Sequence, residues 1–322
     1  MITTVLDGLA GVEGWSVTHA RGADILTLEE DPRGAKFPDG QPRPSVVVPS
    51  APDETLIAEA VAAAAESEVV VAVVGDRIEL VGEGRSTATL ELIGGQNALL
   101  DALIATGKPV VIVLLASKPL VLPASASQAA AVIWAANPGM QGGRALAEII
   151  SGAVEPSGRL PISFARHVGQ QPTYYNQIRG QHGDRYADLT QSPAWAFGEG
   201  LSYSTVSYGE LSLASTTLGR DDTIIAEVTV TNTGERPVRE TVQVYVRDSI
   251  TSVSWADREL KGYRQVDLAP GESARVRLDL AVAECSIVDA AGIRRVESGA
   301  FELLVGPSSR DEVLLSAAFT VA

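Results

Sequence analysis

The stretch that decides the fold of the first half is Val69-Val70-Val71-Ala72-Val73-Val74, which ends at Gly75. An unbroken run of small and β-branched apolar residues is typical of a strand buried on both faces of a parallel sheet. Similar runs recur at residues 109–115 and 130–135. Helix-forming stretches flank these runs at residues 58–66, 96–104 and 142–150. The alternation predicts βαβ units, and hence an α/β domain with an open, mostly parallel sheet.

The second half has a different periodicity, because apolar and polar residues alternate after about Thr205. The clearest alternating runs are residues 225–231, 242–246 and 274–278, with turn residues between them. About seven short strands of this kind predict an all-β, immunoglobulin-like sandwich. The single cysteine excludes the paired cysteines of antibody domains, so the fibronectin type III-like variant fits better. We expect an α/β domain over residues 1–160, a loop-rich connector over 161–204 and the sandwich over 205–322.

The composition limits the possible functions. The 322 residues carry a formal net charge of −15 and no run of Lys and Arg, which argues against nucleic-acid binding. The lone Cys285 excludes an intrachain disulfide. No basic segment followed by an apolar run opens the chain, so we expect a cytoplasmic protein, with secretion left open if the chain is a fragment. The three histidines lack metal-ligand spacing, and no nucleotide-binding or nucleophile-elbow motif is present, so we expect no metal and no cofactor.

The loop after the first buried strand is the candidate site, because ligands of open parallel sheets bind beyond the carboxyl ends of the strands. It contains Gly82-Glu83-Gly84-Arg85. Flanking glycines let a loop backbone adopt unusual dihedral angles and approach a partner closely. From these residues alone, a solvated carboxylate is the better interpretation of Glu83 than a catalytic one. Asp76 and Glu79 on the same loop are expected to be surface charges.

Several segments in order resemble glycoside hydrolase family 3. The segments are Gly82-Glu83-Gly84-Arg85, Leu90-Glu91-Leu92-Ile93-Gly94-Gly95-Gln96, Asn137-Pro138-Gly139-Met140-Gln141-Gly142-Gly143, Ser157-Gly158-Arg159-Leu160-Pro161, Phe197-Gly198-Glu199-Gly200-Leu201-Ser202-Tyr203 and Glu259-Leu260-Lys261-Gly262. Each alone is weak, but their order and spacing together cover almost the whole chain.

The resemblance implies the C-terminal part of a retaining β-glycosidase, most simply a β-glucosidase. Such enzymes begin with a barrel that carries an aspartate nucleophile, and a glutamate of the following α/β domain acts as general acid/base. Glu83 occupies the matching position, whereas the barrel and the first strand of the α/β domain have no counterpart here. The implied partners are a β-linked glucoside or oligosaccharide and a barrel on another chain or a removed segment, with a homo-oligomer as a further possibility. The alternative is a non-catalytic carbohydrate-binding or structural module.

Three further residues are candidate substrate contacts: Arg85, Gln141 and Trp195. Some family members place a glutamate in the turn around Gln141, and an amide cannot replace it as an acid, which leaves Glu83 as the sole proton donor. Each candidate has a simpler alternative role: Arg85 as an exposed surface arginine, Gln141 as part of a tight turn, and Trp195 in the packing of the connector. The choice among glucose, xylose, arabinose and N-acetylglucosamine stays open.

Overall fold

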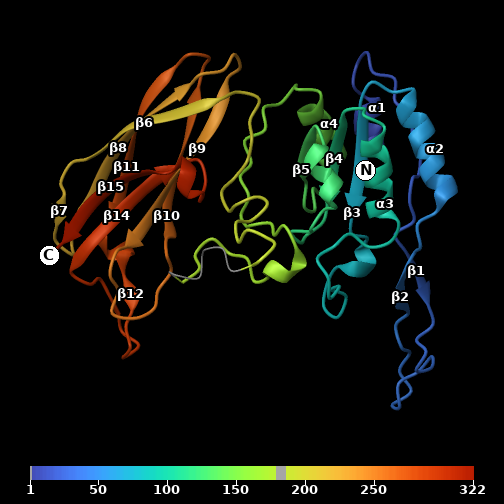
Figure 1. The fold of residues 1–322 in the computed structure, drawn as a ribbon, viewed down its shortest axis with the longest axis horizontal. Coiled ribbons are helices and arrows are strands. Elements are labelled where there is room, and N and C mark those ends of the chain that lie inside the picture. Colours follow the sequence, from blue (N-terminus) through green and yellow to red (C-terminus); the bar gives the residue numbers. More distant parts are fainter. Residues whose placement is uncertain (1, 179–185) are drawn as a thin grey trace. The chain divides into compact units, whose positions relative to one another are not determined.

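The computed structural model describes residues 2–178 and 186–322, which form two compact units (Figure 1). Unit 1 comprises Met1–Ser151 and Arg166–Gly169, and unit 2 comprises Gly152–Ala165 and Gln170–Ala322. The predicted fold class is confirmed: an α/β unit is followed by an all-β sandwich. The finer division at residues 160 and 204 stays a prediction.

Unit 1 follows the predicted alternation of strands and helices. Its elements are α1 (Val5–Ala10), β1 (Leu26–Glu29), β2 (Val46–Pro49), α2 (Glu54–Ala65), β3 (Val70–Gly75), the 3₁₀ turn η1 (Ile78–Leu80), α3 (Gln96–Ala105), β4 (Val110–Leu115), η2 (Ala124–Gln128), β5 (Ala131–Trp134) and α4 (Gly142–Ile150). A further 3₁₀ turn, η3, spans Val168–Gln170. Asp53 caps α2, because its carboxylate accepts hydrogen bonds from the backbone N–H groups of Thr55 and Leu56.

The central sheet of unit 1 is parallel, in the order β3-β4-β5. β4 is the middle strand, and its Ile112, Val113 and Leu114 are fully buried, as expected for a strand covered on both faces. The prediction that β3 is equally buried is wrong at Val73, which is 44% exposed. Within the described residues β3 pairs with β4 alone, so one of its edges has no neighbouring strand.

The carboxyl end of β3 is fixed by a side-chain clamp. Gln96, the first residue of α3, is 2% exposed. Its Oε1 accepts a hydrogen bond from the N–H of Gly75 at 2.7 Å, and its Nε2 donates to the carbonyl of Gly75 at 3.0 Å. A Cβ on Gly75 would lie 2.0 Å from the carbonyl oxygen of Leu115, and the φ of Gly75 is +143°, so only glycine fits. The clamp sets where the chain leaves the sheet.

Close packing of two helices explains the glycine-rich turn before α4. A Cβ on Gly143 would lie 1.9 Å from the carbonyl oxygen of Thr4, and one on Gly8 would lie 2.1 Å from the carbonyl oxygen of Gly143. The backbone N–H of Thr3 also donates to the carbonyl of Met140 at 2.9 Å. These glycines let α1 lie directly against the start of α4, so they serve the packing of the unit.

Unit 2 is a sandwich of two sheets in which neighbouring strands are antiparallel, except for one parallel pair at an edge of the larger sheet. Its strands are β6 (Val206–Leu213), β7 (Thr217–Leu218), β8 (Thr223–Asn232), β9 (Val238–Asp248), β10 (Glu259–Leu268), β11 (Ser273–Ala281), β12 (Ile287–Val288), β13 (Arg294–Arg295), β14 (Gly299–Gly306) and β15 (Leu315–Val321), with 3₁₀ turns η4 (Val282–Cys285) and η5 (Asp311–Val313). The larger sheet has the order β10-β9-β14-β15-β7 and the smaller one β11-β8-β6. The predicted number of about seven strands omitted short ones such as β7.

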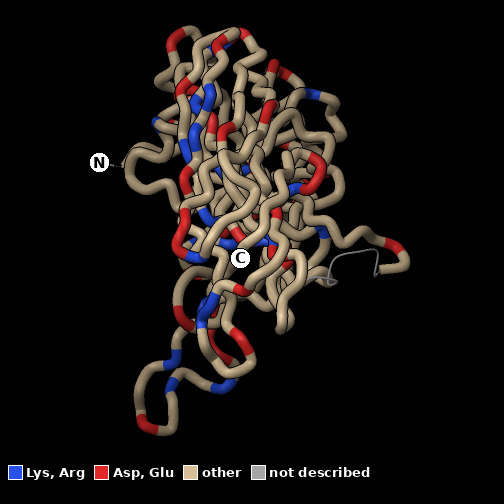
Figure 2. The backbone as a smooth tube through the Cα atoms, turned by 90° about the vertical axis from the view of Figure 1, so that its left-hand side faces the viewer, with Lys and Arg blue, Asp and Glu red and all other residues tan. Residues whose placement is uncertain are grey.

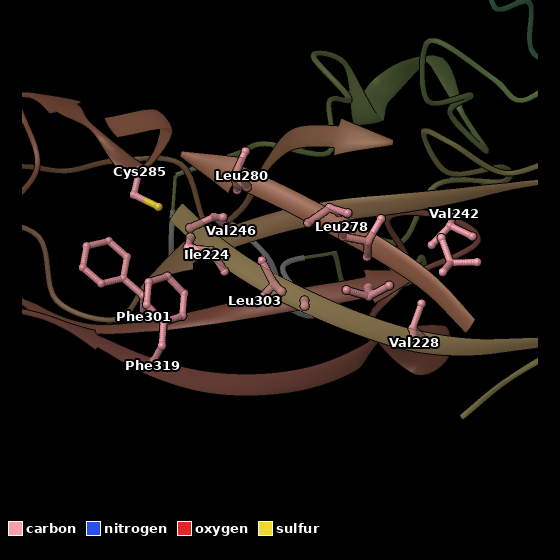
Figure 3. Packing of buried hydrophobic residues seen from close by; sticks show 14 of the residues in the cluster. Ile224, Val228, Val242, Val246, Leu278, Leu280, Cys285, Phe301, Leu303 and Phe319 are labelled. Atoms are coloured by element: carbon pink, nitrogen blue, oxygen red, sulfur yellow. The ribbon is translucent and has the colours of Figure 1, made fainter. Parts of the chain in front are cut away.

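One apolar cluster lies between the two sheets (Figure 3). Alternating residues of β8, among them Val228 and Val230, are fully buried and meet residues of β9 and β14. Phe301 and Phe319 stack with ring centroids 5.3 Å apart. The period of two seen in the sequence therefore marks the inward face of each strand.

Two family-like motifs, residues 157–161 and 197–203, pair with each other and are anchored to the sandwich. The N–H of Leu160 donates to the carbonyl of Glu199, and the N–H of Gly198 donates to the carbonyl of Leu160, at 2.9 and 2.7 Å. Gln243 of β9 donates to the carbonyl of Gly198 at 2.9 Å. These contacts give both motifs a structural role in unit 2.

An ion pair anchors the first of these motifs. Arg159 Nη2 lies 2.8 Å from Glu240 Oε2, and both side chains are at least nine-tenths buried. The hydroxyl of Tyr208 donates to Glu240 Oε1 at 2.7 Å. Burial, and next the negative charge of Glu240, raise the pKa of that hydroxyl, so Tyr208 remains a donor at every ordinary pH.

Acidic and basic residues are interspersed along the described backbone (Figure 2). Among the helices of that part of the chain, none has both the length and the apolar character needed to cross a bilayer.

The clamp at Gly75 gives the first testable prediction. Gln96→Leu should lower the free energy of unfolding of unit 1 by about 2 kcal/mol, because it leaves buried polar groups of Gly75 without partners. Amide hydrogen exchange of residues 70–76 measures the loss. Gln128→Leu is the matched control, since Gln128 is exposed and its side chain makes no hydrogen bond within the described residues. Equal exchange in the two variants would contradict the stabilising role of the clamp.

The buried ion pair of unit 2 gives the second prediction. Arg159→Met should destabilise unit 2 by about 3 kcal/mol, because it leaves Glu240 buried without its cation. Arg239→Met is the control, since Arg239 and its partner Asp267 are both exposed and surface ion pairs contribute little. Urea denaturation followed by hydrogen exchange of β9 measures both variants. An effect of Arg159→Met no larger than that of the control would refute the prediction.

Candidate active-site loop

The loop that joins β3 to α3 leaves the carboxyl edge of the parallel sheet (Figure 1). Glu83 lies on this loop. The N–H of Arg85 donates to the carbonyl of Gly82 at 3.2 Å, which closes a tight turn around Glu83. Gly82 and Gly84 have φ values of +111° and +69°, a region that favours glycine. These two glycines give the turn its shape and leave the Glu83 side chain projecting from the loop.

The Glu83 carboxylate is exposed and makes no hydrogen bond or ion pair with residues 2–178 or 186–322. An unpartnered carboxylate is free to engage a ligand or a second protein surface. Of the four carboxylates between β3 and α3, those of Asp76 and Glu79 are paired with cations, whereas those of Glu83 and the exposed Glu91 have no partner within the described residues. Glu83 is the one that lies in the glycine turn.

The expectation that Asp76 is a surface charge is wrong. Its side chain is 6% exposed, and its Oδ2 lies 3.2 Å from Lys118 Nζ. Asp76 directly follows the buried strand β3, so its side chain begins inside the unit. A buried carboxylate requires a compensating cation, which Lys118 provides.

Glu79 is also paired, within its own turn. Its carboxylate contacts the guanidinium of Arg77. Its own backbone N–H, followed by Arg77 and the nearby Arg85, lowers the pKa of its carboxyl below the ordinary value. Glu79 is therefore held as an anion, which is the wrong state for a proton donor.

Arg85 and Gln141 lie in unit 1 at the edge that carries Glu83. Arg85 is exposed within the same turn and has no ion pair in the described chain. Gln141 is exposed and precedes α4, in the connection that follows β5. Strand order places β4 between the strands that lead to Glu83 and to Gln141. Within the described residues, no hydrogen bond or ion pair joins Gln141 to the Glu83 turn, and Arg85 and Gln141 stay candidate substrate contacts.

Trp195 belongs to unit 2 and is partly buried. Its ring meets Phe164 edge-on with centroids 5.6 Å apart, and its backbone pairs with that of Phe164. The neighbouring Tyr175 stacks on Phe197 at 4.1 Å, and its hydroxyl accepts a hydrogen bond from the N–H of Leu260 at 3.0 Å. These contacts give both side chains a packing role, and stacking of Trp195 on a sugar stays a prediction.

Sequence reasoning missed Lys118. Its only signal was its place just after the buried run at residues 109–115, which puts it at the same edge of the sheet as Glu83. Across the described residues, no group of three or more His, Cys, Asp or Glu side chains is arranged to hold a metal ion.

Comparison with known proteins agrees with the fold. A family model described as "Glycosyl hydrolase family 3 C-terminal domain" matches residues 2–203, and one described as "Fibronectin type III-like domain" matches residues 240–309. The periplasmic beta-glucosidase of Salmonella typhimurium is 34% identical over 95% of this chain, and the beta-xylosidase of Formosa agariphila is 38% identical over 99%.

A solved structure of a β-glucosidase involved in saponin metabolism from intestinal bacteria superposes with a TM-score of 0.96 at 55% identity. The match covers 100% of this chain and 46% of that one. The chain likewise spans 41% of the length of each of the two curated relatives. Because the first family model matches more than half of its residues, this chain belongs to glycoside hydrolase family 3, of which it represents the C-terminal α/β domain followed by a fibronectin type III-like domain.

Proposed function

We propose that this chain supplies Glu83 as the general acid/base of a retaining β-glycosidase whose nucleophile lies outside these 322 residues. The observation that carries the proposal is that Glu83 is the unpaired carboxylate of the glycine turn; Glu91, the loop's other unpaired carboxylate, lies outside that turn and nearer to α3. Asp76 and Glu79 are paired with cations, whereas Glu83 projects from a glycine turn without a partner. A retaining mechanism needs two carboxyl groups about 5–5.5 Å apart, one to attack the anomeric carbon and one to transfer protons.

The exposure of Glu83 fits a role completed by another protein surface. A general acid must hold its proton at the working pH, which requires burial or a nearby negative charge. The nucleophile of a partner domain would supply that charge, and its surface would exclude water from the turn. The resemblance to the family suggests that the partner is a barrel, on the same longer protein or on another chain.

A β-glucoside is the proposed substrate class. Relatives that match this chain are named for glucosides and for xylosides, so 4-nitrophenyl β-glucoside and 4-nitrophenyl β-xyloside should be compared directly. We expect the higher kcat/KM with the glucoside. A higher kcat/KM with the xyloside would make a β-xyloside the substrate class and would leave the role proposed for Glu83 unchanged.

The role of Glu83 is tested in the enzyme assembled with its barrel. Glu83→Gln should lower kcat by about 10²–10⁴ on glucosides with poor leaving groups, which need protonation as they depart. The formation of the glycosyl-enzyme from 2,4-dinitrophenyl β-glucoside should be far less affected, because that leaving group departs as an anion. The measurement is the pre-steady-state rate of glycosyl-enzyme formation with each substrate.

Glu79→Gln is the control for that experiment, since Glu79 lies on the same loop and is paired with Arg77. It should retain activity within a few-fold on both substrates. If Glu83→Gln lowers the activity equally on substrates with good and with poor leaving groups, the assignment of Glu83 as the acid/base is wrong.

The purified chain alone gives a separate prediction. It should release no measurable 4-nitrophenol from 4-nitrophenyl β-glucoside, because an acid/base carboxyl without its nucleophilic partner cannot form the covalent glycosyl-enzyme intermediate. Addition of the barrel polypeptide should restore turnover in the chain with Glu83 and not in the Glu83→Gln variant. Turnover by the chain alone that depends on Glu83 would overturn the proposed division of the catalytic pair.

A further inference from the structure

We propose that Lys118 is the positioning residue that fixes the loop carrying Glu83; this inference rests on the function proposed for that loop. Lys118 follows the central strand β4 and contacts both legs of the loop. It would act through the placement of Glu83, without touching substrate.

The two legs of the loop are tied to the same short segment of chain. On the outgoing leg, the N–H of Asp76 donates to the carbonyl of Leu115 at 2.9 Å. On the returning leg, the N–H of Val121 donates to the carbonyl of Leu90 at 2.7 Å, and Glu91 pairs with Val121 in a parallel bridge. Residues 115–121 thus form a base that spans both legs.

Lys118 lies in the middle of this base and joins the legs through one ammonium group. Its Nζ is 3.2 Å from Asp76 Oδ2 on the outgoing leg and 3.0 Å from Thr87 Oγ1 on the returning leg. Its side chain is 20% exposed and that of Asp76 6%, so solvent screens the pair weakly.

The hydrogen bond to Thr87 has a defined direction. The Thr87 hydroxyl donates to the carbonyl of Thr89 at 2.8 Å, which leaves its lone pairs to accept from Lys118. The N–H of Glu91 in turn donates to Thr89 Oγ1 at 3.1 Å. The ammonium group is therefore connected to the whole returning leg, from Thr87 to Glu91.

The rest of the loop has few other anchors. Leu80 of η1 is 3% exposed and holds the middle of the outgoing leg in the apolar interior. Between Leu80 and Thr87 the hydrogen bonds within the described residues are local, such as the turn from Gly82 to Arg85, and two glycines make the backbone pliable. The position of Glu83 is then set by Leu80 on one side and by the Lys118–Thr87 contact on the other.

This placement matters because proton transfer depends steeply on distance and direction. A displacement of about 1 Å at a catalytic group can cost roughly 10²-fold in rate. Loss of Lys118 would also leave Asp76 as a buried carboxylate without a cation, which would favour movement of the outgoing leg toward water.

Limited proteolysis of the 322-residue chain tests the positional part of the proposal. Trypsin cleavage after the exposed Arg85 should be roughly tenfold faster or more in Lys118→Met, because a charged contact to a shielded partner is lost and the loop opens locally. Removal of Lys118 deletes no efficient trypsin site, since Pro119 follows it.

Lys108→Met is the matched control. Lys108 precedes the same strand β4 at its opposite end, and its Nζ donates to the carbonyl of Ser67 at 2.8 Å. Cleavage after Arg85 should be unchanged in this variant. Thr87→Val is the second test variant, because it removes the contact to the returning leg while Asp76 keeps its cation. An Arg85 cleavage rate in both Lys118→Met and Thr87→Val equal to that of Lys108→Met would overturn the proposal.

The assembled enzyme tests the catalytic consequence. Lys118→Met should lower kcat on a poor-leaving-group glucoside by roughly 10-fold or more with little change in KM, and should affect glycosylation by 2,4-dinitrophenyl β-glucoside much less. Lys118→Arg, which keeps the positive charge and offers N–H donors to both Asp76 and Thr87, should recover most of the lost kcat. Equal losses on both substrates would mean a general structural defect and would refute a positioning role.

The two proposals fail in different ways. If the rate loss in Glu83→Gln does not depend on the leaving group, the proposed function is wrong. The rate of trypsin cleavage after Arg85 in Lys118→Met still shows whether Lys118 fixes the loop. If Glu83→Gln shows that dependence and Lys118→Met does not, the positioning role alone is wrong.

Discussion

The backbone of Gly75 is the point on which the candidate site depends. Gln96 holds both its N–H and its carbonyl, and the carbonyl of Leu115 lies where any side chain would have to be. The amide of Gln96 bonds to the end of β3 much as a neighbouring strand would. It also opens α3, so one residue joins the end of a strand to the start of the next helix. The loop that carries Glu83 begins at this junction and returns to it.

Most of the motifs that resemble the family have structural roles in this chain. Gly143 lets α1 lie against α4, and Gly198 lets the connector meet Gln243 of the sandwich. Arg159 neutralises a buried glutamate. Within the candidate loop, by contrast, Gly82 and Gly84 face open space, since a Cβ at either position would meet no atom within 4 Å. Their conformations shape the turn and leave room around Glu83 for another surface.

The order of strands and helices could be predicted from the sequence, because burial imposes a period on each element. The run at residues 69–74 and the alternation at 225–231 both became strands, β3 and β8. The exposure of Val73 could not be predicted, since it depends on how many strands pair with β3 and leaves no trace in the run itself. A run of apolar residues shows that a strand exists without showing whether it is central or at an edge.

The candidate site was only partly predictable for a similar reason. The sequence places Glu83 in a glycine turn after a strand, which is a local property. The pairing of Asp76 with Lys118 joins two loops that follow different strands, so it exists only once the sheet has formed. Asp76 was therefore mistaken for a surface charge, and Lys118 was overlooked. Polar residues directly after parallel strands are best considered together, because the sheet brings them to one edge.

The central claim is that these 322 residues hold one member of the catalytic pair and that the other lies elsewhere. A 2-deoxy-2-fluoro-β-glucosyl fluoride tests it directly, because the glycosyl group remains on the nucleophile after fluoride departs. Mass spectrometry of the inactivated, assembled enzyme should find the sugar on a peptide of the barrel and none on this chain, including the peptide that contains Glu83. A covalent 2-fluoroglucosyl group on any carboxylate of this chain would contradict the account.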